Sequence, residues 1–194
     1  SEERSAVLPL VTSPAPSQPQ RPRRIDCDAA LIGTWTWQPN RIGLDWFLEK
    51  VAPRLRSDFR IRIAGSLPSG MAATHPGIVF VDRVPDARAF VRSAAVIPLI
   101  STAGSGVQLK TVETFELGLP SVATSHSLRG IDHRPANCVV TDDPAAFAAA
   151  LEAAAADVHD VDGGAFHKRQ IEALDAAVAR GLVRLGAVGK EAFA

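Results

Sequence analysis

The stretch from Ser101 to Glu113 has the residue types and spacing of an anion-binding loop followed by a helix. Its glycines permit a tight turn that exposes consecutive backbone N–H groups, and its hydroxyl side chains can add donors. The start of the following helix adds unpaired N–H groups and a positive dipole end, which stabilise an anion by about 0.3–2 kcal/mol. The residues that we expect to form this cradle are Ser101, Thr102, Gly104, Ser105, Gly106 and Val107.

Lys110 and Glu113 follow the loop three residues apart, which places them on one face of the expected helix. Lys110, one turn into the helix, can reach the same anion, and a hydrogen bond to a charged group contributes about 1.5–3 kcal/mol. Taken alone, the two residues have the commoner explanation of a surface ion pair, which contributes little. Beside a phosphate site a carboxylate is useful as a hydrogen-bond acceptor, and a ribose diol is the natural donor. The spacing therefore favours a nucleotide, with its diphosphate at the helix start and its ribose at Glu113.

The elements that must position these residues alternate along the chain. Apolar runs predict strands at 29–33, 59–65, 78–81, 94–100, 121–124 and 138–141. Helical spacing and helix-terminating residues predict helices at 40–55, 85–93, 107–117, 143–157 and 164–185. Strands separated by helices form right-handed βαβ units. The prediction is therefore an α/β fold, a Rossmann-like doubly wound parallel sheet of about six strands with helices on both faces.

Ligands of such sheets bind beyond the carboxyl ends of the strands. Gly33 and Thr34 end the first predicted strand, so we expect them to contact the same ligand as the loop. Gly65 and Ser66 end the second strand, and together with Val84 they are the expected neighbours of a nucleotide base, chiefly through their backbone.

The aromatic and histidine residues give weaker signals. Trp35 and Trp37 follow the first strand and either line the cleft or pack in a core, whereas Trp46 lies on an apolar helical stripe and is expected in the core. The histidines show no ligand spacing with Asp, Glu or Cys, so no metal site is predicted and each is expected on the surface or in a loop. They are His75, His126, His133, His159 and His167.

Composition narrows the classes of function. The formal net charge is zero, which removes the electrostatic reason to expect a nucleic-acid partner. No apolar run approaches the ~18–20 residues that cross a bilayer, and the first residues lack the pattern of a signal peptide, so a cytoplasmic location is expected. Cys27 and Cys138 lie far apart and favour two free thiols of a reducing compartment over a disulfide.

The run GSGVQLKTVETFELGLPSVAT resembles the G-x-G-x-x-x-K-x-x-E-x-x-x-x-G-x-P-V-V-A-T block of the group 1 (family 4-like) glycosyltransferases, a large family with the two-domain GT-B fold. DDPAAFAAAL is similar to that family's helix after the last strand, and the resemblance covers most of residues 29–155. Three earlier stretches resemble further family blocks in the same order, namely GTWTWQPNRIGLDWFLEKVAPRL, FRIRIAGSLP and FVDRVPDARAFVRSAAVIPLI.

The resemblance implies a C-terminal donor-binding domain for a nucleoside diphosphate sugar, carrying a UDP- or GDP-linked sugar. Glu113 takes the position of the family's ribose-binding carboxylate, and Lys110 is expected to stabilise the leaving diphosphate as a catalytic group. The resemblance also implies retention of anomeric configuration, no metal or other cofactor, and a role in glycan or polysaccharide synthesis. An N-terminal acceptor domain absent from this chain is the expected partner, and through it the protein could associate with the inner face of a membrane.

The sequence departs from the family pattern at two positions. Ser105 stands where many members have a second glutamate, eight residues before the ribose carboxylate. The basic residue usual after the first glycine strand is also missing, since Thr34 and Pro39 occupy that stretch and Arg41 is the nearest substitute.

The expected organisation has three parts. Residues 13–24, SPAPSQPQRPRR, are rich in Pro, Ser and Arg and read as a linker. We therefore expect 1–28 to be linker and the remnant of an upstream domain, 29–185 the nucleotide-sugar-binding domain, and 186–194 a tail. Two other functions remain open, a non-catalytic protein-interaction module on the same fold and a nucleotide-sugar epimerase.

Overall fold

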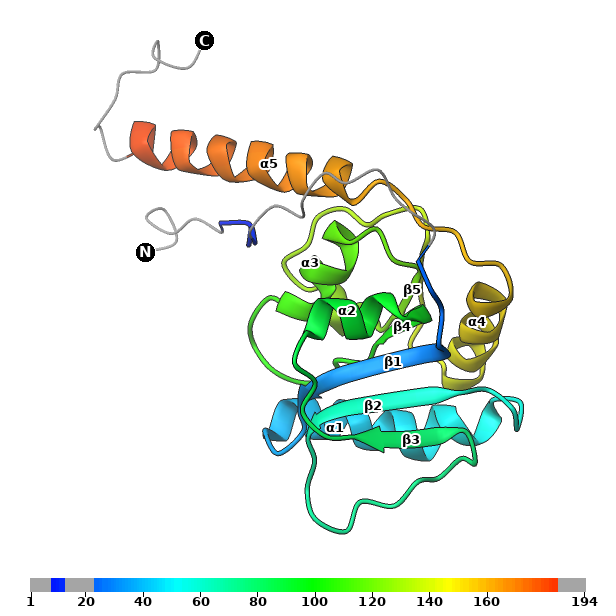
Figure 1. Ribbon diagram of the computed structural model, residues 1–194. Helices are drawn as coiled ribbons and strands as arrows, with labels where there is room; N and C mark the ends of the chain where they lie inside the picture. The colour runs from blue at the N-terminus through cyan, green and yellow to red at the C-terminus, as the bar shows by residue number, and fades with distance from the viewer. Residues whose placement is uncertain (1–7, 13–22, 185–194) are drawn as a thin grey trace.

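The computed structural model describes residues 8–12 and 23–184 (Figure 1). At its centre is a six-stranded sheet of order β3-β2-β1-β4-β5-β6, and every neighbouring pair is parallel. The strand order reverses between β1 and β4, as in a doubly wound sheet. The strands are β1 Cys27–Thr34, β2 Ile61–Ser66, β3 Ile78–Val81, β4 Ala94–Leu99, β5 Ser121–Ala123 and β6 Cys138–Val140.

Helices connect the strands at the predicted places. The first is α1 Gln38–Trp46, which continues through a π-helical turn, η2 Phe47–Val51, and a 3-10 turn, η3 Ala52–Arg54. The others are α2 Ala87–Arg92, α3 Leu109–Glu116, the 3-10 turn η4 Ser125–Leu128, α4 Pro144–Ala156 and α5 Gly163–Arg184. The predicted α/β class with a Rossmann-like sheet is confirmed.

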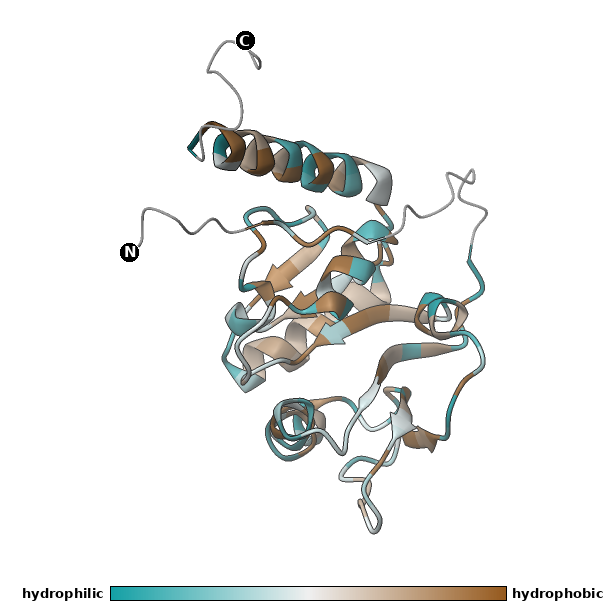
Figure 2. Cartoon of the chain, turned by 90° about the vertical axis from the view of Figure 1, so that its left-hand side faces the viewer, coloured by the Kyte–Doolittle hydropathy of each residue, from teal (hydrophilic) through white to brown (hydrophobic). Residues whose placement is uncertain are grey.

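The strands divide their side chains between two apolar layers, because successive residues of a strand point to opposite faces. On β1, Ala29 and Leu31 belong to one layer and Ala30 to the other. The first layer is covered by α1, η2 and α4, and the second by α2, α3 and the start of α5 (Figures 1 and 2). Helices therefore cover both faces, as predicted.

An edge-to-face aromatic pair joins two helices in each layer. Trp46 meets Phe147 edge to face at 5.3 Å, joining α1 to α4. Phe115 meets Phe166 in the same way at 5.2 Å, joining α3 to α5. Such pairs contribute about 0.5–1.5 kcal/mol beyond the area they bury. The expected core position of Trp46 is confirmed.

Three helix starts differ from the prediction. α1 begins at Gln38, two residues early, and α3 begins at Leu109, two residues late. The expected place of Pro85 in the first turn of α2 is wrong, because α2 begins at Ala87 and Asp86 is its cap.

The chain before β1 contacts the domain at the two places that the structure describes. The Arg23 side chain, 5% exposed, pairs with Asp160 at 2.8 Å and donates to backbone carbonyls between Arg92 and Ala95. The backbone N–H of Thr12 donates to Glu116 on α3 at 3.4 Å. The predicted linker is therefore wrong at Arg23, which is part of the folded body; 13–22 and the predicted tail 186–194 lie outside the described residues.

Cys27 on β1 and Cys138 on β6 are buried free thiols, in line with the prediction. Burial raises the pKa of Cys27 to about 11 and raises the pKa of Cys138 as well. Thiolate is the reactive form, so neither cysteine is placed for nucleophilic chemistry.

Candidate functional site

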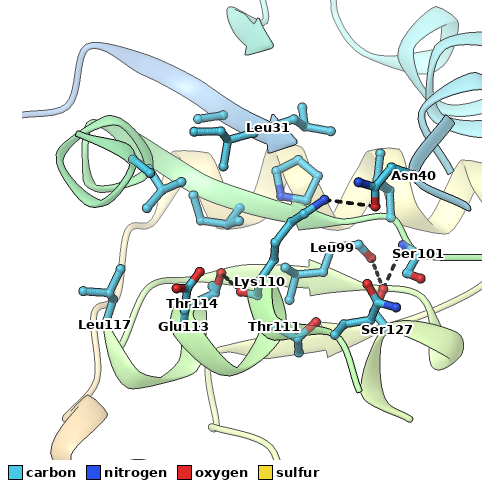
Figure 3. Close-up of a pocket in the computed structure, with 18 of the residues that line it drawn as sticks. Leu31, Asn40, Leu99, Ser101, Lys110, Thr111, Glu113, Thr114, Leu117 and Ser127 are labelled. Atoms are coloured by element: carbon cyan, nitrogen blue, oxygen red, sulfur yellow. Dashed lines mark hydrogen bonds between the residues drawn. The ribbon is translucent and has the colours of Figure 1, made fainter. Parts of the chain in front are cut away.

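A pocket lies over β1 and β4, where the strand order reverses, between α2 and α3 (Figure 3). Side chains of β1, β4, Trp35 and Val91 form its apolar wall. Its polar lining comes from the starts of α1, α2 and α3 and from the turns after β4 and β5. These polar residues are Asn40, Arg88, Ser101, Gln108, Lys110, Thr111, Glu113, Thr114 and Ser127.

Lys110 is the second residue of α3, and its side chain crosses the pocket toward the start of α1 (Figure 3). Its Nζ lies 3.3 Å from Asn40 Oδ1 and 5.0 Å from the centre of the Trp35 ring. Burial lowers the pKa of Lys110 to about 8, although nearby Glu113 acts in the opposite direction. Within the described part of the chain, no carboxylate comes close enough to form an ion pair with it. Lys110 is thus a partly desolvated cation held by an amide oxygen and an aromatic face.

Gly33 makes room for this lysine. A Cβ added at Gly33 would lie 3.0 Å from Lys110 Nζ and 3.2 Å from the Trp35 ring. Gly65, paired with Gly33 across the sheet, has φ +115°, and a Cβ there would lie 1.9 Å from the Gly33 carbonyl oxygen. Gly33 therefore leaves space for Lys110, and Gly65 lets β2 pass close to the backbone of Gly33.

Trp35 and Trp37 have different environments. Trp35 is 2% exposed, lines the pocket, and donates its indole N–H to the Ala64 carbonyl at 2.8 Å. Trp37 is 56% exposed and does not line the pocket. Of the two alternatives for these residues, Trp35 fulfils both, because it packs in the core and presents its ring to Lys110.

Glu113 lines the pocket one turn after Lys110, and burial raises the pKa of its carboxyl. Arg88 on α2 opposes this rise, Glu116 adds to it, and Lys110 opposes it more weakly. Two cations and one carboxylate therefore act on Glu113, and it forms no ion pair with the described residues. This leaves its oxygens available to hydroxyl donors.

The loop before α3 only partly matches its prediction. Gly104 has φ +107°, the left-handed region that glycine allows, whereas Gly106 does not have a positive φ. Because α3 begins at Leu109, Lys110 lies in its first turn rather than one turn in. Among the predicted cradle residues, Ser101 lines the pocket and the loop 102–107 leads from it to α3.

The starts of α1 and α3 meet beside this loop. A Cβ on Gly104 would lie 3.6 Å from Pro39 Cβ, and Lys110 reaches Asn40, so both starts border one space. Neither the α1 cap, Trp37, nor the α3 cap, Gln108, makes a side-chain cap hydrogen bond. Two positive helix ends are therefore free to act on one anion.

Several predicted residues lie beside the pocket rather than in its lining. The Thr34 carbonyl accepts a hydrogen bond from Asn40 Nδ2 at 3.1 Å, which fixes the turn into α1. The predicted base neighbours do not line the pocket; they are Gly65, Ser66 and Val84.

Sequence reasoning missed Asn40, Arg88, Gln108 and Ser127 as pocket residues. Asn40 had a signal, since it ends the W-x-P-N run after the first strand. The other three had none, because their place in the site depends on contacts between distant segments.

Histidines and acids do not form a metal centre in the described residues, where no group of three or more His, Cys, Asp and Glu could hold an ion. Of the two alternatives for the histidines, His75 takes the loop, since it precedes β3, but it is buried there at 6% exposure. Its Nε2 lies 3.0 Å from the Arg56 carbonyl, and its Nδ1 accepts from Gly77 N. His75 thus fixes the turn before β3. No described helix is both long enough and apolar enough to span a bilayer.

The chain is similar in sequence to one known protein family. The sequence model of the family Glycosyl transferases group 1 matches residues 28–157, more than half of the chain. No curated protein matches. Among solved structures, the chain is similar to the DNA-modifying enzyme β-glucosyltransferase, crystallised in the presence and absence of its substrate uridine diphosphoglucose, at 13% identity and TM-score 0.48. It is also similar to CalG4, the calicheamicin glycosyltransferase, at 19% identity and TM-score 0.42.

The alignments cover 89% of this chain and 53% of the β-glucosyltransferase chain, and 94% of this chain and 47% of CalG4. This chain therefore spans about half the length of each of these enzymes. The family match runs from β1 to α4 and includes Lys110, Glu113 and the pocket between α2 and α3. Because the family model matches more than half of the chain, the chain belongs to the group 1 family of glycosyltransferases.

Proposed function

We propose that this chain is the donor-binding domain of a glycosyltransferase and that it binds a nucleoside diphosphate sugar in the pocket between α2 and α3. The observation that carries the proposal is the setting of Lys110. A partly buried cation without a close anion destabilises a fold, unless a ligand supplies the missing charge. Lys110 faces a pocket bordered by two uncapped helix starts, so an anionic ligand completes the arrangement.

The diphosphate is assigned to the starts of α1 and α3. Each helix end contributes about 0.3–2 kcal/mol to a nearby anion. Lys110 adds a charged hydrogen bond of about 1.5–3 kcal/mol. Ser101, at the carboxyl end of β4, adds a hydroxyl in the pocket lining.

The ribose is assigned to Glu113. One turn along α3 from Lys110, this carboxylate lies at the distance along the helix that separates a ribose from its phosphates. Hydrogen bonds from the two ribose hydroxyls favour the ionised carboxylate and oppose the rise that burial causes in its pKa.

In the transfer step, the bond between the anomeric carbon and the diphosphate oxygen breaks, and its electron pair remains on the diphosphate. A bond forms between the acceptor hydroxyl oxygen and the anomeric carbon, and the hydroxyl proton passes to the departing diphosphate. Lys110 and the N–H groups of the two helix starts are preorganised to stabilise the charge that develops there. An epimerase would need several acid–base groups at the sugar, but Glu113 is the single carboxylate among the described residues of the lining, and no histidine is among them.

The proposal extends to the whole protein. A second domain supplies the acceptor site and any group that activates the acceptor, and the donor is a UDP- or GDP-sugar used in glycan synthesis. Transfer proceeds with retention and needs no metal or other cofactor. The protein acts in the cytoplasm, or at the inner face of a membrane through the acceptor domain.

Isothermal titration of UDP and GDP into the chain tests the proposal. We expect one of the two to bind, and Glu113→Ala to weaken it by about 10- to 100-fold, since it removes hydrogen bonds to a charged group. The exposed Glu49→Ala on η2 is the matched control and is expected to bind as wild type. Undiminished affinity of Glu113→Ala overturns the ribose assignment, and failure of both nucleotides to bind favours a non-catalytic interaction module.

A further inference from the structure

The turn after β5 contacts the loop between β4 and α3 at three successive points. This turn, Thr124–Gly130, contains η4 and directly follows the three-residue strand β5. The loop, 101–107, is the segment to which the proposed function assigns part of the diphosphate site. The contacts occur at residues 101, 104 and 107, so they hold the beginning, middle and end of the loop.

The first point of contact is Ser101. Thr124 Oγ1 donates to the Ser101 carbonyl, and the Ser101 N–H donates to Ser127 Oγ at 3.0 Å. Ser127 Oγ in turn donates to the Leu99 carbonyl at 2.7 Å (Figure 3). Thr124 and Ser127 are each 1% exposed. The start of the loop is therefore fixed by buried hydroxyl groups.

The second point is Gly104. The Arg129 guanidinium donates to the Gly104 carbonyl, 25 residues earlier in the chain. Glycine at φ +107° has wide conformational freedom, so a tether is needed to keep one orientation. In a trans peptide the carbonyl and the next N–H point in opposite directions. By holding the Gly104 carbonyl, Arg129 also sets the direction of the Ser105 N–H.

The third point is Val107. Gly130 has φ +74°, and a Cβ added to it would lie 2.7 Å from Val107 Cγ2. Gly130 therefore lets the turn pack closely against the last residue of the loop, just before the α3 cap.

We propose that Thr124–Gly130 is a clamp that sets the anion-binding shape of the loop 101–107, with Arg129 as its positioning residue. This inference rests on the proposed function and adds a second chain segment to the diphosphate site. It separates recognition of the diphosphate, which depends on the clamp, from recognition of the nucleoside, which depends on Glu113 and the pocket wall.

The test compares Arg129→Met and Arg129→Lys with Arg134→Met. Arg134 is a matched control because it is also exposed and donates to a backbone carbonyl, that of Cys138, at 2.6 Å. Affinities for UDP and GDP are measured by isothermal titration, and those for uridine and guanosine by ligand-observed NMR. Thermal unfolding checks that each variant is folded.

We expect Arg129→Met to lower the affinity for the preferred nucleoside diphosphate by about tenfold or more. This is the change expected from losing a hydrogen bond to a charged group. Its nucleoside affinity should stay within about twofold of wild type, because an exposed residue outside the pocket lining affects few other contacts. Arg129→Lys should recover most of the loss, and Arg134→Met should bind as wild type. Gly130→Ala, which displaces Val107, should repeat the selective loss.

Two results overturn the clamp while leaving the proposed function intact. One is an Arg129→Met variant that binds the diphosphate as wild type; the other is one that loses nucleoside and diphosphate affinity equally, which indicates a general structural role. If wild type binds neither UDP nor GDP, the proposed function fails and the clamp fails with it. That outcome is distinguishable because it appears before any substitution is made.

Discussion

Two pairs of helices in this domain begin in opposite ways. α2 and α4 start at aspartates, and the carboxylates of Asp86 and Asp143 accept from Ala89 N at 3.0 Å and Ala146 N at 2.8 Å. α1 and α3 start without side-chain caps, and their starts meet beside the loop 101–107, whereas the capped start of α2 lines the same pocket at Arg88. At each capped start one first-turn N–H group is bound by an aspartate of the chain, whereas the starts of α1 and α3 have no such side-chain acceptor at the cap. The two helix starts assigned to the diphosphate therefore lack the stabilisation that a capping side chain gives to α2 and α4.

Substitution of Lys110 should have the largest effect on diphosphate binding. Lys110→Met should weaken diphosphate binding by about 100-fold, because it removes a charged hydrogen bond in a partly desolvated site. The same change should stabilise the ligand-free chain by up to about 3 kcal/mol, since each unit by which burial lowers the pKa corresponds to about 1.4 kcal/mol. Titration and chemical denaturation measure the two effects.

Lys50→Met on η2 is the control for Lys110→Met, because Lys50 is exposed and outside the pocket lining. A Lys110→Met variant that is less stable than wild type, or that binds the diphosphate unchanged, contradicts the account.

The pKa of Lys110 predicts how diphosphate affinity and the free energy of unfolding depend on pH. The pKa of Lys110 is lowered from 10.5 to about 8 in the ligand-free fold. Above pH 8 the empty site loses its cation, and diphosphate affinity should fall by up to about tenfold per pH unit. Between pH 8 and 10.5 the unfolded chain binds the extra proton, so the free energy of unfolding should rise with pH relative to Lys110→Met. Titrations at several pH values check the fall in diphosphate affinity, and denaturation curves check the rise in the free energy of unfolding. An affinity that stays constant from pH 7 to 10 contradicts this prediction.

Adding a capping side chain to α3 tests whether its uncapped start contributes to binding. Gln108→Asp supplies the carboxylate that Asp86 and Asp143 give to their helices. It should raise the free energy of unfolding by about 1 kcal/mol. It should also weaken binding of the diphosphate severalfold, because the new carboxylate competes for the same N–H groups and repels the anion. Gln108→Asn, an uncharged cap, should stabilise similarly with a smaller loss of affinity. Equal affinities for the wild type and the Asp variant are the result that opposes the assignment.

Removing a cap from α4 has the smallest expected effect on binding. Asp143→Ala should lower the free energy of unfolding by about 1 kcal/mol, the usual value of a cap. It should leave nucleoside diphosphate affinity unchanged, because α4 covers the opposite face of the sheet from the pocket. Denaturation and titration together measure this, and a parallel loss of affinity shows that capped and uncapped starts are not separable.

The fold was predictable from the sequence because its signals are local. Apolar runs mark the strands, Asp143 and Pro144 mark the start of α4, and Gly118 marks the end of α3. The start of α3 was misplaced because Val107 continues the apolar spacing of the helix, although its side chain packs against Gly130 instead. Local spacing cannot distinguish these two uses of a valine.

The site was predictable only along α3. Lys110 and Glu113 are both on one helix, so their spacing fixes their common face. The contact of Lys110 with Asn40 joins residues 70 positions apart, and that of Arg129 with Gly104 joins residues 25 apart. Such contacts depend on which strands become neighbours in the sheet, which no local pattern contains.

Backbone amide NMR during titration with the preferred nucleoside diphosphate shows which helix starts bind the ligand. We expect the largest shifts at the first-turn N–H groups of the uncapped helices, Asn40 on α1 and Leu109 and Lys110 on α3. Little change is expected at Ala89 and Ala146, whose N–H groups are already bound by Asp86 and Asp143. Shifts that are equal at the two kinds of helix start, or confined to the capped ones, would contradict this expectation.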